Sequence, residues 1–148
     1  MDVDVEADGP QLIGKYKKRY EEERAKVAAN PQYEIPEKSS NCEPGGMPTM
    51  MTMPYSLEFL FTPGRVTIVL EHDDTSVRRI YTDGRNHTDD PDPSYNGESI
   101  GRWDGETLVV HTVGISSRAE IIAGVPTSGR ATVTERILFY SGKSHKIG

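Results

Sequence analysis

The sequence predicts a mainly β protein, an antiparallel β-barrel or strongly curved sheet of the lipocalin (calycin) type, with one N-terminal helix. Two observations predict it. After residue 54, six runs alternate apolar and polar residues with the period of a half-buried strand. No helical pattern alternates with these runs, so a parallel sheet is not expected. The runs cover residues 56–62, 65–72, 77–83, 99–105, 106–114 and 131–140.

The breaks between the runs are typical of hairpins and loops. Pro63-Gly64 separates the first two runs, and Asp104-Gly105 between two alternating runs favours a type I′ hairpin. A longer loop is expected over residues 115–130. Because tight turns reverse the chain, the runs predict a meander of antiparallel strands.

One helix is expected before the strands, over residues 9–29, and Asn30-Pro31 ends it. The helix and a Pro-, Gly- and Met-rich coil make up residues 1–54. They are expected to pack on a barrel formed by residues 55–148, within one structural domain. The apolar residues that recur near one helical face are Leu12, Ile13, Tyr16, Tyr20 and Val27.

Composition excludes several classes of protein. The chain has 148 residues, the length of one ordinary domain, and its net charge of −6 argues against a nucleic-acid partner. No apolar run is long enough to span a bilayer. Cys42 is the single cysteine, so neither an intrachain disulfide nor a zinc site of several thiolates can form.

The coil before the first strand is rich in methionine, which allows two interpretations. Thiolate and thioether groups are ligands that suit Cu(I), whereas methionine also fills irregular gaps where a coil lies across a core. The Pro and Gly content, with no histidine between the methionines, favours packing. The residues concerned are Cys42, Met47, Met50, Met51 and Met53.

A carboxylate lies on the apolar face of the last predicted strand. Side chains two apart share a face, so Glu135 lies with Ile137 and Phe139. A carboxylate in that position pairs with a buried arginine or has its pKa raised by desolvation. Arg79 shares a face with Tyr81 and is the expected partner if that face points inward. The pair would be either a structural ion pair or part of a catalytic or ligand-binding site.

The segment that leaves the third run, IYTDGRNHTDDPDP, gathers titratable groups. Tyr81, Asp83, Arg85 and His87 follow at every second position, so an extended chain would project all four to one side. His87 can exchange protons near neutral pH, and Asp83 can orient it or act as a base. Arg85 can hold an anion, and Tyr81 can donate a proton to an oxyanion. The alternative is a turn in which Asp83-Gly84 bends the chain.

Two further histidines lie on strands with apolar neighbours. His72 and His111 are candidates for a second acid or base, together with Glu135. Two histidines and a carboxylate can also hold iron or copper, but no His-x-His or His-x-x-x-His spacing supports that alternative. Trp103 and Tyr95 are interpreted as core or rim aromatics that can contact a ligand.

Four motifs occur in order along residues 10–140: CEPGGMP, RRIYTDGRNH, GESIGRWDGETLVV and TER. Together they resemble a largely uncharacterised family of bacterial proteins from proteobacteria and acidobacteria. Many members look exported, so the resemblance implies a periplasmic or secreted location, with a cytoplasmic one as the alternative. It also implies that His87, Trp103 and Glu135 are signature positions, whereas His111 stands where the family has an aspartate.

These observations favour a small-molecule enzyme. It would perform cofactor-free acid–base chemistry of lyase, dehydratase or isomerase type on an apolar organic substrate in a barrel cavity. The candidate catalytic residues are His87, Asp83, Tyr81, His111 and Glu135, and the candidate substrate contacts are Arg85, Arg79, His72, Trp103 and Tyr95.

Two alternatives stay open at this point. One is a non-catalytic periplasmic protein that binds a lipid or an aromatic compound. The other is a copper- or iron-dependent oxidase. The expected partner is a small molecule, with no nucleic acid and no membrane span, and a homo-oligomer would be compatible with a barrel completed by another subunit.

Overall fold

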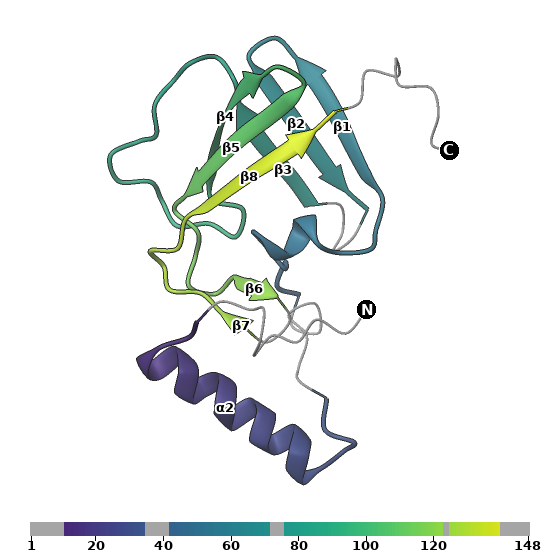
Figure 1. Ribbon diagram of the computed structural model, residues 1–148, viewed down its shortest axis with the longest axis vertical. Helices are drawn as coiled ribbons and strands as arrows, with labels where there is room; N and C mark the ends of the chain where they lie inside the picture. Colours follow the sequence, from purple (N-terminus) through teal and green to yellow (C-terminus); the bar gives the residue numbers. More distant parts are fainter. Residues whose placement is uncertain (1–10, 35–41, 72–75, 123–124, 140–148) are drawn as a thin grey trace. The chain divides into compact units, whose positions relative to one another are not determined.

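The computed structural model describes residues 11–34, 42–71, 76–122 and 125–139 (Figure 1). By contacts the chain divides into two compact units, residues 1–36 and 37–148. The expectation of one structural domain stays a prediction.

The first unit holds helix α2 (Gly14–Ala29), which is the helix that the sequence predicts. It begins later than expected, because Gly14 takes a φ of +56° and Ile13 before it is extended. The expected positions 9 and 10 lie outside the described residues. None of the helix's residues is buried. Within the described ranges, no helix is long and apolar enough to cross a membrane.

The second unit is built on one six-stranded sheet in the order β1-β2-β3-β4-β5-β8, which curls into a half-barrel (Figure 1). The predicted mainly β class with a curved sheet is confirmed. A short pair, β6 with β7, forms in the segment predicted as a loop. The elements are η2 (Thr49–Met51), β1 (Leu57–Thr62), β2 (Arg65–Leu70), β3 (Ser76–Tyr81), β4 (Glu98–Asp104), β5 (Thr107–Val113), β6 (Glu120–Ile122), β7 (Val125–Pro126) and β8 (Val133–Leu138).

One junction of the sheet is parallel, so the prediction of antiparallel strands throughout is wrong there. β3 and β4 run in the same direction and pair at Ile80–Ser99 and Tyr81–Ile100. A tight turn would have reversed the chain, but residues 82–97 separate these two strands, which is enough for a crossover. The pairing covers just the end of β3 and the start of β4.

The inner face of the sheet is filled by two apolar clusters. Met47 and Met50 belong to the first cluster, with exposed fractions of 0% and 2%, so these methionines of the coil pack into the core. Met51 contacts both clusters, whereas Cys42 is exposed. The first cluster also holds Leu70, Ile115 and Ala119, and the second holds Val66, Ile68, Ile80, Leu108 and Val110.

The arginine that faces the core is Arg78, so the predicted pairing of Glu135 with Arg79 is wrong. Along β3, Arg78 and Ile80 are buried, whereas Val77 and Arg79 are exposed. The sequence allowed either face to point inward, and the need to bury Ile80 decides the choice. Arg79 therefore lies on the outer face of the sheet.

The buried guanidinium of Arg78 connects four strands. Its Nη1 donates to Oε1 of Glu135 at 3.0 Å, and its Nη2 donates to the other carboxylate oxygen. Nε and Nη2 donate to Oγ of Ser99 at 3.2 and 3.1 Å, and Nη2 reaches Oγ1 of Thr112 at 3.0 Å. The prediction that Glu135 lies on the inner face is confirmed. The Arg78 guanidinium donates to both oxygens of its carboxylate.

We expect Arg78→Met to lower the free energy of unfolding by about 3–5 kcal/mol, because the carboxylate of Glu135 loses its buried partner. Arg79→Met is the matched control, one position along on the outer face, and should change the free energy by less than about 0.5 kcal/mol. Urea unfolding followed by Trp103 fluorescence measures both variants. Equal losses in the two variants would contradict a structural role for the Arg78 network.

Candidate functional site

A hollow of about 350 Å³ lies on the outer face of β4 and β5, under the segment that follows β3. The strand residues that form its floor alternate with buried ones, so they point away from the core. We call it the histidine hollow. Its lining residues are Gly84, Arg85, Asn86, His87, Ile100, Gly101, Arg102, Val109 and His111.

A local turn positions the segment over the sheet. Gly84 has a φ of +83°, which bends the chain directly after Asp83. The Asp83 carboxylate accepts bonds from Nε and Nη2 of Arg85 at 2.9 and 2.6 Å, and a weaker one from its backbone N–H at 3.3 Å. The Arg85 guanidinium lies 3.9 Å from the ring centre of Tyr81. Of the two alternatives for this segment, the structure has the turn at Asp83-Gly84, and the extended chain that would project Tyr81, Asp83, Arg85 and His87 to one side is not formed.

The Asp83–Arg85 contact also favours the ionised form of both side chains. The hydrogen bonds from Arg85 hold the pKa of the Asp83 carboxyl below its usual value. The same bonds raise the pKa of Arg85. Asp83 is thus tied to an arginine and not to His87, so the predicted Asp83–His87 pair is wrong. Arg85 lines the histidine hollow, and Asp83 neutralises its positive charge.

A chain of hydrogen bonds runs along one side of the hollow. Nδ1 of His87 lies 2.8 Å from Oε1 of Glu98, and Nε2 of His87 lies 3.0 Å from Nδ1 of His111. The two ring centres are 5.1 Å apart, so the facing nitrogens lie nearly between them. The backbone N–H and the hydroxyl of Thr88 donate to the same carboxylate at 3.0 and 2.8 Å. Glu98, which the strand prediction from residue 99 excluded, is thus the carboxylate that orients His87.

The ionised carboxylate of Glu98 determines which nitrogen donates in each hydrogen bond of this chain. An ionised carboxylate accepts hydrogen bonds and cannot donate, so Nδ1 of His87 must carry the proton toward Glu98. Neutral His87 then accepts at Nε2, which requires His111 to donate from Nδ1. The remaining nitrogen of His111, Nε2, holds a free lone pair and has no hydrogen-bond partner among the described residues. The chain therefore presents a base at the edge of the hollow.

The Glu98 carboxylate is the acceptor at one end of the hydrogen-bonded chain, and its surroundings lower its pKa. Burial acts to raise its pKa, but the bonds from His87 and from the hydroxyl and N–H of Thr88 together outweigh burial, so the pKa is lowered. The side chains of His87 and Glu98 are 22% and 28% exposed. His111 is exposed on the strand surface. The carboxylate thus stays ionised and accepts the hydrogen bond from Nδ1 of His87.

Comparison of the chain with protein-family models, with curated proteins and with solved structures gives no match. The resemblance to the bacterial family stays a prediction. The candidate site rests on the geometry of the chain itself.

The structure brings together part of the predicted catalytic set. His87 and His111 share one hollow, as expected, but Glu135 does not join them. His111 pairs with Thr134 across the β5–β8 ladder, whereas the neighbouring Val110 pairs with Glu135 and points into the core. Glu135 is therefore on the opposite face of the sheet. The two histidines meet outside the half-barrel rather than in a barrel cavity.

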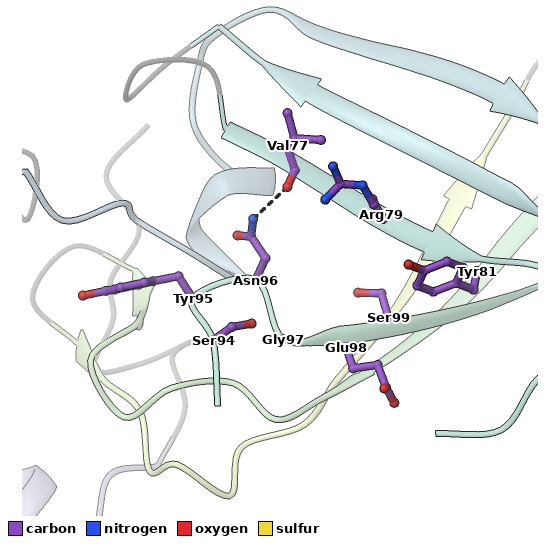
Figure 2. Close-up of a pocket in the computed structure, with 9 residues that line it drawn as sticks. All are labelled: Val77, Arg79, Tyr81, Ser94, Tyr95, Asn96, Gly97, Glu98 and Ser99. Carbon is purple, nitrogen blue, oxygen red and sulfur yellow. Dashed lines mark hydrogen bonds between the residues drawn. The ribbon is translucent and has the colours of Figure 1, made fainter. Parts of the chain in front are cut away.

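A second hollow of about 370 Å³ forms where β3 and the chain before β4 diverge (Figure 2). We call it the Arg79 hollow. Figure 2 shows Arg79 and Tyr81 on β3 along one side, and Asn96 bonded through Nδ2 to the carbonyl oxygen of Val77 at 3.2 Å. The carboxylate of Glu98 points away from Arg79 in this view. The remaining lining residues are Ser94, Tyr95, Gly97 and Ser99.

The other predicted contacts lie elsewhere. Trp103 packs in an aromatic group with Phe61 and Phe139, at ring-centre distances of 6.3 and 5.6 Å. Tyr95 lines the Arg79 hollow and lies below the guanidinium of Arg118, at 5.7 Å. His72 falls outside the described residues.

Sequence reasoning missed Glu98 and Arg102. Glu98, Ile100 and Arg102 are two apart along β4 and share its outer face. Starting the strand one residue earlier would have placed Glu98 on the same face as Arg102. The outer face would then have shown charged groups at both ends of the strand.

We expect His111 to hold its proton on Nδ1 in the native protein, since its partner nitrogen on His87 must accept. The imidazole resonances in ¹⁵N NMR report this tautomer directly. In His87→Phe the acceptor is lost, so His111 should shift toward the Nε2–H form, which is more common in free histidine. A Thr134→Ser variant on the neighbouring strand is the control and should leave the tautomer unchanged. An Nε2–H form of His111 in the native protein would contradict the assigned direction.

The lowered pKa of Glu98 predicts the sign of a pH effect on stability. A carboxyl whose pKa is lower in the folded state adds stability above its usual value of 4.5, and this contribution disappears as pH falls through the folded pKa. Glu98→Gln should therefore be less stable than the native protein near neutral pH, and the difference should shrink by about pH 3. Urea midpoints at both pH values measure it. A difference that does not change with pH would rule out the ionised Glu98–His87 contact.

Proposed function

We propose that the protein is a small-molecule enzyme that performs cofactor-free acid–base chemistry, of lyase, dehydratase or isomerase type, in the histidine hollow. The observation that carries the proposal is the hydrogen-bonded chain from Glu98 through His87 to His111. A carboxylate that orients one imidazole, which in turn accepts from a second, holds the last nitrogen in a fixed position with its lone pair free. A positioned base of this kind contributes about 10²–10⁴-fold to a rate.

The proposed step begins with proton removal by Nε2 of His111. The imidazolium that forms is stabilised through its Nδ1–H by His87, and the Glu98 carboxylate holds His87 in the accepting orientation. The floor of Ile100 and Val109 gives the substrate an apolar surface. The proton returns from His111 to the product or to water, so the side chains end the cycle unchanged.

The alternatives have weaker support. Binding without turnover is favoured by the Arg79 hollow, whose lining contains no imidazole among the described residues. A metal-dependent oxidase needs converging ligands, and the part of the chain that the structure describes has no group of three His, Cys, Asp or Glu side chains that could hold a metal ion. Both nitrogens of His87 are already engaged.

A ring-opening probe tests for the base. Removal of the C3 proton of 5-nitrobenzisoxazole breaks its N–O bond and releases a coloured cyanophenolate, without a cofactor. We expect the native protein to catalyse this reaction and His111→Gln to lower kcat/KM by about 10²–10⁴-fold. His87→Phe should have a smaller effect and shift the pH profile, because it removes the orienting partner and leaves the base.

The control for this probe is Thr134→Ser, which changes the register partner of His111 and none of the hydrogen-bonded chain. It should keep the native rate. The proposal fails if His111→Gln and the native protein open the ring equally fast.

A further inference from the structure

Among the described residues, one cationic side chain of the histidine hollow has no partner. Arg85 is paired with Asp83, and His87 is bonded to Glu98. Arg102, which lines the same hollow, has no ion-pair or hydrogen-bond partner among the described residues. The exposed Asp104 on the same strand pairs with Arg136 at 3.4 Å instead. The hollow thus keeps one free guanidinium.

Strand register places this guanidinium beside the base. Across the β4–β5 ladder, Ile100 lies opposite His111 and Arg102 lies opposite Val109. Arg102 and His111 are therefore diagonal neighbours on the outer face, a relation that separates residues by about 7–8 Å and lets long side chains act on one ligand. The two apolar residues fill the other diagonal. A molecule lying on Ile100 and Val109 has a cation at one corner and the free Nε2 of His111 at the other.

We propose that the substrate of the histidine hollow is a small organic monoanion, a carboxylate with an apolar body, whose carboxylate binds Arg102. This inference rests on the proposed function and names the substrate class of that site. A planar guanidinium holds a carboxylate through two parallel hydrogen bonds, which also orients the apolar body over Ile100 and Val109.

The charge and the volume of the hollow narrow the class of substrate further. A single guanidinium without an anionic partner, on a chain of net charge −6, favours a monoanion over a phosphate dianion. The volume of about 350 Å³ is near the lower end of the range of roughly 300–1,000 Å³ for ligand sites. The carboxylate compound is therefore small, with one ring or a short chain.

Binding of benzoate, measured by isothermal titration and by NMR of backbone amides, tests the assignment without turnover. We expect benzoate to bind and to shift the amides of Ile100, Val109 and His111. Benzyl alcohol, which has the same ring and no charge, should bind at least about 10-fold more weakly. Arg102→Met should weaken benzoate binding about 10- to 100-fold, and Arg102→Lys should restore part of it.

Arg130→Met is the control. Arg130 is exposed and lines neither hollow, so its loss should leave benzoate binding unchanged. Arg79→Met tests the neighbouring hollow as the place where the anion binds. The proposal is overturned by unchanged binding in Arg102→Met, by equal binding of benzyl alcohol, or by a loss confined to Arg79→Met. None of these outcomes depends on ring opening. A failure of the acid–base proposal is therefore measured separately, by the ring-opening rate of His111→Gln.

Discussion

The buried guanidinium of Arg78 is the interaction on which the rest of the second unit depends. It connects β3, through Ser99, Thr112 and Glu135, to β4, β5 and β8. A charge 1% exposed can remain in the core because oxygens from three other strands accept its hydrogen bonds. A shift of β3 by one residue would bury Arg79 in its place and expose Ile80, so the burial of Ile80 and this network together set which face of the strand is outward.

The candidate site follows from that choice of faces. With Arg78 inward, Tyr81 and Arg79 point outward. On β4 and β5, Arg102 and His111 do the same, because Ser99 and Thr112 turn inward to the guanidinium. The inner face is filled by the two apolar clusters and the ion pair. The histidine hollow therefore lies on the outside of the half-barrel, where the chain after β3 supplies its second wall.

That loop exists because β3 and β4 are parallel. A hairpin would have joined them in two residues, whereas the crossover of residues 82–97 passes over the outer face and carries His87 to His111. Two local contacts hold the loop in place: the Asp83–Arg85 ion pair at its start, and the bonds from Thr88 to Glu98 near the start of β4. The catalytic proposal thus depends on a topology that also separates β3 from the chain before β4 and opens the Arg79 hollow.

The sequence by itself determined the β class, six strands of the sheet and the inward side of Glu135, and it left a bend at Asp83-Gly84 as one of two alternatives. These follow from a period of two and from turn chemistry, which act between residues close along the chain. It also indicated His87 and His111 as candidates. Tertiary structure decided the partners, because a carboxylate meets a base only when strands distant in sequence come side by side. Thus Arg78 replaced Arg79 as the partner of Glu135, and Glu98 replaced Asp83 beside His87, since periodicity defines two faces of a strand but does not say which one the fold will bury.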